Sequence, residues 1–340
     1  MSLFPSRKIG IDLGSTNTLI YIYRKGIVLR EPSLVAVRPN QAEVIAYGKE
    51  AKELVGRTSE KIELIHPIQS GVIHHFSLTK QMLAHFIQKS THRKMTRPEV
   101  VISVPSNISK VERRAVIDAL REIGINRAML VDVPVAAIIG AGVDISEPLG
   151  HMVVDIGGGT TDIGTFSFGE MIERMTIPVG GVRMNQLIQA YVRVEHQLVI
   201  SDEASERLKL EIGNANYTKS DAKDQLTIQG RHATLGTPKE VTIRSQLVAN
   251  ALSEAIDQII VAIRQVLQRT SPELSADIMN EGIILTGGGA LLKRLPERLK
   301  EALGVDFHLA DQAMDCVAIG AGRLLESFDD EARRIERMNR

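Results

Sequence analysis

Residues 9–18 read I-G-I-D-L-G-S-T-N-T, and residues 153–162 read V-V-D-I-G-G-G-T-T-D. Each segment is an apolar run that ends near an aspartate and continues through a Gly, Ser or Thr turn into a second β-prone run. This order predicts a strand–turn–strand hairpin with a carboxylate at the end of its first strand. Small residues let backbone N–H groups approach an anion, and hydroxyl groups add donors. Together the two segments predict a two-lobed clamp for a phosphate chain.

A third glycine-rich turn strengthens this interpretation. Gly287, Gly288 and Gly289 follow an apolar segment, residues 280–286, that we expect to be a strand, and they precede an expected helical segment, residues 290–295. Anionic ligands bind well beside helix N-termini. Each turn alone could be an ordinary hairpin turn, but three at three strand ends favour a ligand site. The spacing of the glycines matches neither the Rossmann nor the Walker pattern.

Composition narrows the class of protein. The chain has 340 residues, enough for two domains, and its 41 basic and 41 acidic residues cancel. The charge balance gives no reason to expect nucleic acid as a partner. The only cysteine is Cys316, which excludes an internal disulfide and favours a reducing compartment. Because no apolar run approaches the roughly 20 residues of a membrane span and residues 1–8 lack a secretory pattern, we expect a cytoplasmic protein.

The two halves repeat the same order of elements. Each begins with a glycine-turn hairpin and proceeds through helices to further strands, and Glu147-Pro148 reads as the connector. Such an order predicts mixed sheets covered by helices. The expected helices are residues 79–88, 109–123, 134–142, 182–192, 203–211, 245–269 and 317–327.

Three aspartates inside the turns are candidate ligands for a cation. Mg²⁺ bound to a nucleotide usually takes one or two carboxylates and keeps several waters, so Asp12, Asp155 and Asp162 are candidate direct or water-mediated ligands. The alternative, an aspartate that only forms a turn, fits Asp162 better than Asp155, because Asp155 ends an apolar strand. The nine histidines are scattered and read as surface or core residues.

Further motifs carry a family resemblance. Residues 111–115 read V-E-R-R-A, residues 206–213 read E-R-L-K-L-E-I-G, and residues 272–278 read P-E-L-S-A-D-I. With the three turns, these motifs resemble the actin/Hsp70/hexokinase superfamily of ATP-binding proteins, and within it the MreB family of bacterial actins, almost end to end. The resemblance implies an α/β, actin-like fold, a duplicated ribonuclease H-like architecture with a nucleotide cleft between two lobes. We expect residues 1–145 and 315–340 in the first lobe and 146–314 in the second, with small subdomains at about 33–66 and 182–244.

The resemblance also implies residue roles for ATP and Mg²⁺. The first turn would cradle phosphates from one lobe and the second turn from the other. Glu206 and Lys209, three apart on one helix face, would contact the adenosine, and the third turn would line the base. Asp155 and Thr160 are the candidates for catalysis. The implied nucleotide-binding residues are Gly14, Ser15, Thr16, Asn17, Gly157, Gly158, Gly159, Thr160, Glu206, Lys209, Gly287, Gly288, Gly289 and Ala290.

The sequence departs from the family pattern where hydrolysis is decided. Family members usually carry E-E-P before the small-residue helix, and the second Glu is taken to orient the attacking water; here the residues are Asp132, Val133 and Pro134. Asp162 stands where Glu is usual, and Val182 where an acidic residue is usual. We therefore expect binding of ATP with Mg²⁺ and at most slow ATP hydrolysis, since loss of such a group costs about 10²–10⁴-fold.

The resemblance implies a filament protein that scaffolds cell-wall synthesis and determines rod shape. Assembly would be head to tail, as paired protofilaments, and peripheral on the inner face of the cytoplasmic membrane. Leu3 and Phe4, with Met95 in the basic stretch 92–97, are the candidate membrane contacts, unless both segments are simply solvated. Cell-wall elongation proteins and MreB paralogues are the expected partners. Two alternatives stay open: a non-hydrolysing regulator that co-assembles with a paralogue, and a small-molecule kinase of the same superfamily.

Overall fold

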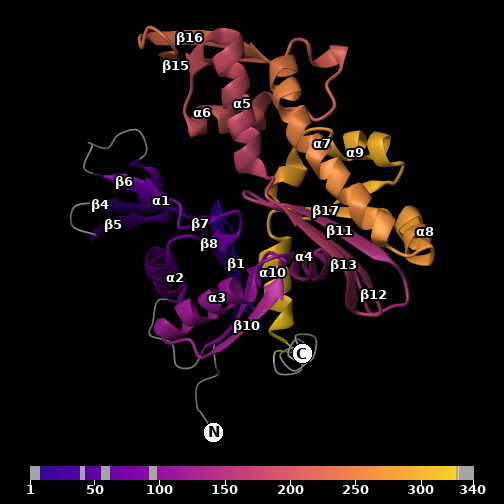
Figure 1. Ribbon diagram of the computed structural model, residues 1–340. Coiled ribbons are helices and arrows are strands. Elements are labelled where there is room, and N and C mark those ends of the chain that lie inside the picture. The colour runs from indigo at the N-terminus through magenta and orange to yellow at the C-terminus, as the bar shows by residue number, and fades with distance from the viewer. Residues whose placement is uncertain (1–7, 39–42, 55–61, 92–97, 327, 329–340) are drawn as a thin grey trace. The chain divides into compact units, whose positions relative to one another are not determined.

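The computed structural model describes residues 8–38, 43–54, 62–91, 98–326 and 328. The chain divides into two compact units, residues 1–145 with 314–340 (unit 1) and residues 146–313 (unit 2). These boundaries lie within one residue of the lobes that the sequence predicts. Each unit has its own five-stranded sheet, and each is described separately below (Figure 1).

The unit 1 sheet has the strand order β10-β9-β1-β2-β3. Strand β1 pairs antiparallel with β2 and parallel with β9, and β9 pairs parallel with β10. Ile9 and Ile11 belong to the core that includes the buried side of α2, while Gly10, which points to the other face, lies against the backbone of α10 at Gly322. The elements are β1 (Lys8–Leu13), β2 (Asn17–Ile22), β3 (Gly26–Pro32), α2 (Phe76–Thr91), β9 (Glu99–Val104), α3 (Lys110–Glu122), β10 (Arg127–Asp132), α4 (Val133–Gly140) and α10 (Cys316–Leu324).

A smaller sheet and a hairpin complete unit 1. The small sheet has the order β5-β4-β6 and packs Ala36 and Ala46 with Ala51 of α1 into a separate small core. The elements are β4 (Val35–Arg38), β5 (Glu43–Tyr47), α1 (Gly48–Lys52), β6 (Glu63–Ile65), β7 (Ile68–Gln69) and β8 (Val72–Ile73).

Glycines allow α4 and α10 to touch through their backbones. A Cβ atom on Gly140 would lie 1.8 Å from the carbonyl oxygen of Cys316, and one on Gly320 would lie 1.8 Å from that of Ala136. No larger residue fits at either position without separating the helices. This contact explains why both helices are rich in small residues.

The unit 2 sheet repeats the topology of unit 1. Its order is β13-β12-β11-β17-β18, with β11 antiparallel to β12 and parallel to β17. The strands are β11 (His151–Ile156), β12 (Thr161–Ser167), β13 (Glu170–Ile177), β17 (Ile283–Thr286) and β18 (Phe307–Leu309). A three-stranded sheet is formed by β14 (Leu198–Val199), β15 (Gln225–His232) and β16 (Pro238–Arg244). The helices are α5 (Gly181–His196), α6 (Asp202–Ile212), η2 (Lys219–Asp221), α7 (Ser245–Arg269), α8 (Pro272–Glu281), η3 (Gly288–Leu291) and α9 (Leu295–Leu303).

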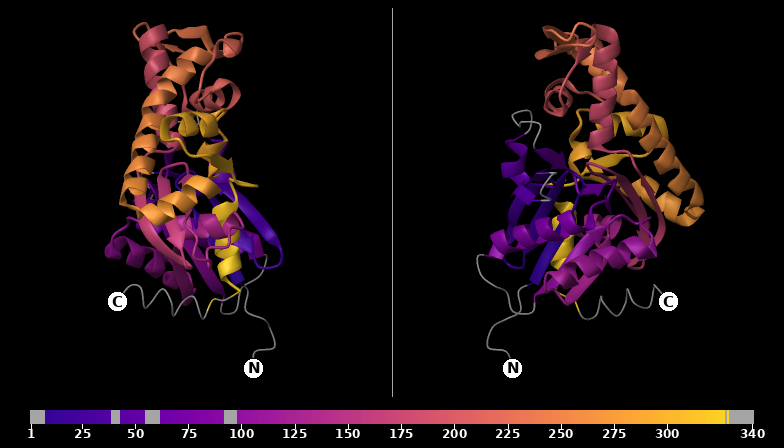
Figure 2. Two further views of the ribbon diagram at one scale, coloured as in Figure 1. Left: turned by 90° about the vertical axis from the view of Figure 1, so that its right-hand side faces the viewer. Right: turned by 60° about the vertical axis from the view of Figure 1, so that its left-hand side comes forward.

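Helix α7 is the longest in the described chain and lies against α5 (Figures 1 and 2). By length and composition it is the one described helix that could cross a membrane, with a mean hydropathy of 1.3 over its most apolar window. Half of that window is buried, and the buried stripe, which includes Leu252, Ile256 and Ile263, belongs to the unit 2 core. Packing inside unit 2 therefore accounts for its apolar side.

Two predicted elements after α7 differ from the structure, one in where it begins and one in its type. The segment 280–286 is a strand only from Ile283, because Asn280 and Glu281 end α8 and Gly282 has a φ of 79°. The sequence signals for α8 were Ser271, whose hydroxyl caps the helix, and Pro272 in its first turn. The segment 290–295 is not an α-helix either: a 3₁₀ turn, η3, follows the glycines, and α9 begins at Leu295.

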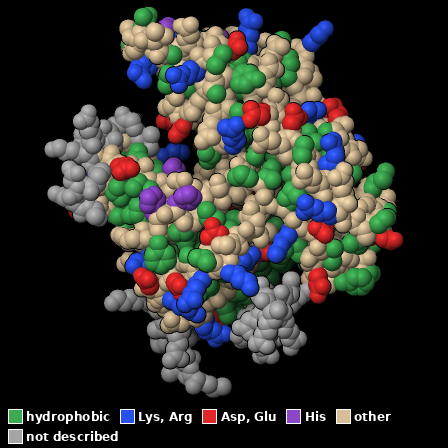
Figure 3. Space-filling model, viewed as in Figure 1, with side chains coloured by type: hydrophobic (Ala, Val, Ile, Leu, Met, Phe, Trp, Pro, Cys, Tyr) green, Lys and Arg blue, Asp and Glu red, His purple; other side chains and the backbone are tan. Residues whose placement is uncertain are grey.

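Charges of both signs are mixed on one face of the molecule. On the face drawn in Figure 3, Lys and Arg side chains are interspersed with Asp and Glu. Two exposed ion pairs in unit 2 join Arg183 to Glu254 at 2.7 Å and Arg298 to Asp257 at 2.9 Å. Exposed pairs of this kind contribute little to stability.

Candidate functional site

The first glycine turn joins β1 to β2. The Gly14 N–H donates to the Asn17 carbonyl at 3.1 Å, which closes the turn, and Asp12 stands opposite Leu19 in the register. Ser103, at the same end of the parallel strand β9, donates its hydroxyl to Asp12 Oδ1 at 2.9 Å. The carboxylate is therefore held at the mouth of the turn.

Hydroxyl groups fasten the first turn to its surroundings. Ser33 donates its hydroxyl to the Gly14 carbonyl at 2.6 Å, and Ser15 Oγ accepts from the Gly71 N–H at 2.8 Å. Thr16 Oγ1, in contrast, is shielded from solvent and has no hydrogen-bond partner among the described residues. A buried hydroxyl without a partner is costly, so this atom fits a polar ligand that the turn would bind.

The second turn joins β11 to β12 with the same backbone. The Gly157 N–H donates to the Thr160 carbonyl at 2.9 Å, and Asp155 stands opposite Asp162. Thr286, on the parallel strand β17, donates its hydroxyl to Asp155 Oδ1 at 2.7 Å. Asp155 thus occupies the position in unit 2 that Asp12 occupies in unit 1.

Asp162 differs from the other two aspartates. It is fully buried, and its two carboxylate oxygens accept hydroxyl hydrogen bonds from Thr160 at 2.8 Å and Thr176 at 2.6 Å. This environment favours a structural role, which was the alternative interpretation from the sequence. Within the described ranges, no three His, Cys, Asp or Glu residues form a group that could hold a metal ion. Asp12 and Asp155 are the better placed of the three predicted cation ligands.

The N-terminus of α5 packs directly on the second turn. The Gly181 and Val182 N–H groups donate to the carbonyls of Gly157 and Gly158 at 3.0 and 2.9 Å. A Cβ atom on Gly180 would lie 2.6 Å from the Gly157 oxygen, so only glycine allows this approach. The turn is therefore held beside the start of a 16-residue helix, where the helix dipole favours anions.

Lys209 brings a cation to the same place. Its Nζ donates to the Gly181 carbonyl at 3.1 Å, and burial lowers the pKa of Lys209 although Glu206, one turn earlier on α6, opposes this shift. Burying an ammonium group costs free energy unless an anion compensates. Lys209 and the α5 N-terminus together make this part of unit 2 suited to an anionic ligand.

The third turn packs against the end of β11. Gly287 has a φ of 82°, and a Cβ atom there would lie 2.4 Å from the carbonyl oxygen of Ile156. Gly289 lies against the Ile156 side chain, where a Cβ would be 2.3 Å from Cγ2. The glycines are thus required for close packing next to Asp155. Unit 2 brings the second turn, Lys209 and the third turn together around the carboxyl end of β11.

The structure shows the burial and the contacts of the residues that depart from the family pattern. Val133 is buried at the start of α4, and the neighbouring Asp132 accepts a hydrogen bond from Arg113 at 2.5 Å. Val182 is exposed in the first turn of α5. The predicted membrane contacts, Leu3, Phe4 and Met95, lie outside the described residues.

Sequence reasoning missed the hydroxyls that hold the two aspartates. Ser103 and Thr286 each stand near the end of a buried strand parallel to the strand that carries the aspartate. The available signal was a polar residue inside or just after an apolar strand, V-V-I-S and I-I-L-T. Their equivalence extends the duplication from the turns to the neighbouring strands.

Comparisons with known proteins agree with this duplicated architecture. The family model described as MreB/Mbl protein matches residues 6–333. The cell shape-determining protein Mbl of Bacillus subtilis is 42% identical over 330 residues, covering 97% of this chain and 98% of the relative. The cell shape-determining protein MreB of Escherichia coli K12 is 39% identical over 330 residues, covering 95% and 94%.

Solved structures give the same assignment. MreB5 of Spiroplasma citri bound to ADP superposes with a TM-score of 0.91 at 31% identity over 96% of this chain and 98% of that one. The same protein bound to AMPPNP gives a TM-score of 0.91 at 30% identity, over 97% and 99%. The MamK double helical filament, at 21% identity and a TM-score of 0.80 over 95% and 99%, shares the actin-like fold. This chain belongs to the MreB/Mbl family of actin-like proteins.

Proposed function

We propose that this chain is an ATP-binding bacterial actin that polymerises into filaments and helps to determine cell shape. The observation that carries the proposal is the repetition of one device, an aspartate held by a hydroxyl at the mouth of a glycine turn, in both units. Two relatives in the family are named as cell shape-determining proteins. The residues of the three turns agree with the roles that a nucleotide would require.

The residues present fit a nucleotide. The unpartnered Thr16 hydroxyl and the half-buried Lys209 ammonium group are both costly without a ligand; phosphate oxygens would accept from Thr16, and oxygens of the nucleoside from Lys209. The related MreB5 binds ADP and AMPPNP in solved structures. The first and second turns would hold phosphates, Glu206 and the third turn the nucleoside, and Asp12 and Asp155 the hydrated Mg²⁺. The bound metal would neutralise phosphate charge.

Hydrolysis is proposed to be slow. Val133 is apolar and buried, so it cannot orient an attacking water, and Asp132 is engaged by Arg113. In the variant Val133→Glu, phosphate release should rise by about 10²-fold or more if this position limits turnover. Val133→Gln, which is nearly the same size but uncharged, serves as the control. A wild-type rate equal to that of Val133→Glu would refute the proposal.

Binding and assembly can be tested with the purified chain. Isothermal titration with ADP and with AMPPNP should give saturable binding that weakens when EDTA removes Mg²⁺. Sedimentation should pellet the protein in the presence of ATP, because a head-to-tail interface does not close. Asp12→Asn with Asp155→Asn should lower Mg²⁺-dependent affinity by about 10–100-fold. The proposal fails if the folded wild-type chain binds neither nucleotide.

Membrane association and the scaffolding of cell-wall synthesis complete the proposal. We place the filaments on the inner face of the cytoplasmic membrane, with Leu3, Phe4 and Met95 as contacts. Flotation with vesicles containing anionic lipid should recover the wild-type chain, and a Leu3→Ser, Phe4→Ser, Met95→Ser variant should stay behind. Equal flotation of the two proteins would remove these residues from the proposal.

The second candidate is a regulator that co-assembles with a paralogue, and the buried Val133 is the observation that favours it. Sedimentation with ATP, alone and with a family paralogue, separates the two functions. Filaments formed by the chain alone support the first, while pelleting only with the paralogue supports the second.

A further inference from the structure

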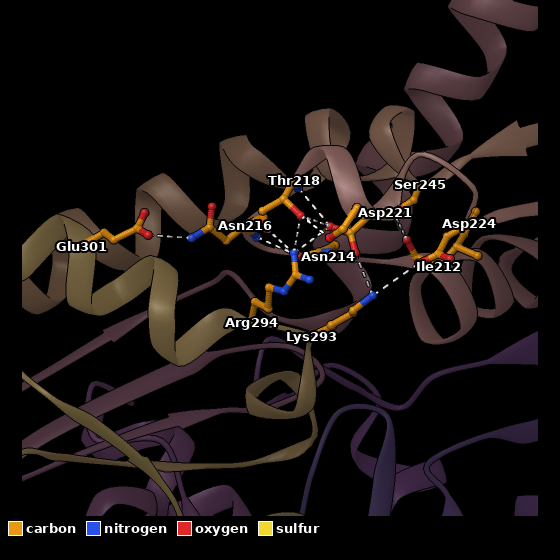
Figure 4. Close-up of polar contacts among 11 residues, drawn as sticks. Ile212, Asn214, Asn216, Thr218, Asp221, Asp224, Ser245, Lys293, Arg294 and Glu301 are labelled. Carbon is orange, nitrogen blue, oxygen red and sulfur yellow. Dashed lines mark hydrogen bonds and ion pairs between the residues drawn. The ribbon is translucent and has the colours of Figure 1, made fainter.

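Two cations that directly follow the third glycine turn converge on one buried carboxylate (Figure 4). Lys293 Nζ lies 3.0 Å from Asp221 Oδ1, and Arg294 Nη1 lies 2.6 Å from Asp221 Oδ2. Asp221 is only 3% exposed. Lys293 also reaches Asp224 at 3.3 Å. We call Asp221, Lys293 and Arg294 the Asp221 cluster.

The Asp221 carboxylate is also held by its own segment. The Thr218 N–H and hydroxyl both donate to Oδ2 at 2.9 Å. The hydrogen bond from the Thr218 backbone, with those from Lys293, Thr218 and Arg294, holds the pKa of Asp221 well below its usual range. The carboxylate is therefore ionised at neutral pH, and it bonds to two chain segments, to Lys293 and Arg294 through both oxygens and to Thr218 through Oδ2.

The cluster joins the chain that leaves α6 to the chain that leaves the third turn. Arg294 Nη1 donates to the Asn216 carbonyl at 3.2 Å and to Thr218 Oγ1 at 3.0 Å, and the Ala215 N–H donates to the Lys293 carbonyl at 2.9 Å. Helix α6, which ends at Ile212, carries Glu206 and Lys209. The two segments proposed to hold the nucleoside are thus fastened to each other through Asp221.

The backbone at Arg294 shows that this attachment is specific. Arg294 has a φ of 57°, in the left-handed region that non-glycine residues rarely adopt. Glycine would take this conformation more readily, but it would lose all three guanidinium contacts. The side chain at 294 therefore contributes contacts that the turn geometry alone does not need.

From this arrangement we propose that the Asp221 cluster is a positioning device that sets how tightly and how long the nucleoside is held. The proposal rests on the nucleotide-binding function proposed above. The three residues act by fixing α6 relative to the third turn, while the phosphate-binding turns are anchored separately through Ser103, Thr286 and the start of α5. Loss of the cluster should therefore weaken binding of a nucleoside triphosphate and spare binding of a bare phosphate chain.

The test compares AMPPNP with inorganic tripolyphosphate on the same variants. Asp221→Asn and Arg294→Gly should each weaken AMPPNP binding by about tenfold, and should speed release of a fluorescent ATP analogue by a similar factor. Tripolyphosphate affinity should stay within about twofold of wild type. Arg294→Gly is the sharper variant, because glycine accepts the left-handed backbone and only the guanidinium is lost. The matched control is Arg298→Ala on α9, which removes the exposed pair with Asp257 of α7.

The outcomes separate the two proposals. If the wild-type chain binds neither AMPPNP nor tripolyphosphate, the nucleotide-binding function fails. If it binds AMPPNP and both cluster variants match it, the positioning role is overturned, as it is when AMPPNP and tripolyphosphate weaken equally. Should Asp221→Asn not fold, Arg294→Gly and Lys293→Met, which keep the carboxylate, decide the question by the same ratio of affinities.

Discussion

The first and second glycine turns have the same backbone and different side chains. In each, the N–H two residues after the aspartate donates to the carbonyl five residues after it, Gly14 to Asn17 and Gly157 to Thr160. In each, a hydroxyl from the neighbouring parallel strand donates to the aspartate, from Ser103 or from Thr286. The repetition in strand order, turn and hydroxyl shows that the two units share one structural plan.

The difference lies at the residue opposite the aspartate. Leu19 faces Asp12 in the first turn, whereas Asp162 faces Asp155 in the second. Asp162 accepts the Thr160 hydroxyl, while the Thr16 hydroxyl in the first turn has no partner among the described residues. The Thr160 hydroxyl of the second turn is thus satisfied within unit 2, whereas the Thr16 hydroxyl of the first turn is left open to a ligand. Substitutions that exchange these features test the comparison.

The largest expected effect is that of replacing Asp162, which faces Asp155 in the second turn, by leucine, the residue that faces Asp12 in the first turn. Asp162→Leu would leave the hydroxyls of Thr160 and Thr176 without their acceptor, so we expect a loss of about 2–4 kcal/mol in the free energy of unfolding, measured by urea denaturation. Replacing both threonines by valine in the same chain should recover at least half of this loss, because neither hydroxyl is then left without its acceptor. A triple variant no more stable than Asp162→Leu would contradict the structural role of Asp162.

The two equivalent glycines should tolerate alanine differently. A Cβ on Gly14 would lie 2.6 Å from the Asn17 carbonyl oxygen, but one on Gly157 would lie 3.4 Å from that of Thr160. We expect Gly14→Ala to cost about 1–3 kcal/mol, and Gly157→Ala to be neutral or slightly stabilising. Thermal unfolding of both variants measures this. Equal losses would mean that the two backbones are constrained in the same way.

Sequence patterns predicted the two hairpins, the aspartates at their strand ends and the helices α2 to α7 and α10, because these depend on local periodicity and turn chemistry. They did not predict α1, α9 or the 3₁₀ turn after Gly287, nor α8, although Ser271 and Pro272 are typical of a helix start. The contacts of the candidate site also escaped: Ser103 is far in sequence from Asp12, and Thr286 from Asp155. No sequence pattern distinguishes Asp221 or Arg294, since a carboxylate in a polar segment is expected to be solvated and its partners lie about 70 residues away in the chain.

Lys209 lies beside the second turn, in unit 2. The sequence predicts no equivalent cation beside the first turn. Because burial lowers the pKa of Lys209 from 10.5, the charged form destabilises the folded state below that pH. Lys209→Met should therefore raise the free energy of unfolding at pH 7 by about 1 kcal/mol, and weaken AMPPNP binding at the same time.

The gain from Lys209→Met should shrink as the pH rises toward 10.5, where the unfolded wild-type chain also loses the proton. Urea unfolding at pH 7 and pH 10 gives the comparison, and Lys223→Met, at an exposed position of the same unit, is the control. A gain that does not depend on pH would point to packing instead of charge.

The smallest stability effect should fall on the threonine of the first turn. Thr16→Val removes a hydroxyl that has no partner among the described residues, so we expect no loss of stability and a gain of at most about 0.5 kcal/mol, whereas Thr160→Val should cost about 1 kcal/mol through the lost bond to Asp162. Affinity for AMPPNP should nevertheless fall by roughly tenfold in Thr16→Val, since a hydrogen bond to a charged oxygen contributes at least that much. Titration and thermal unfolding of the two variants measure both quantities. A Thr16→Val chain that loses stability while keeping full affinity would show that the hydroxyl serves the fold of unit 1, and that the two turns differ less than their side chains suggest.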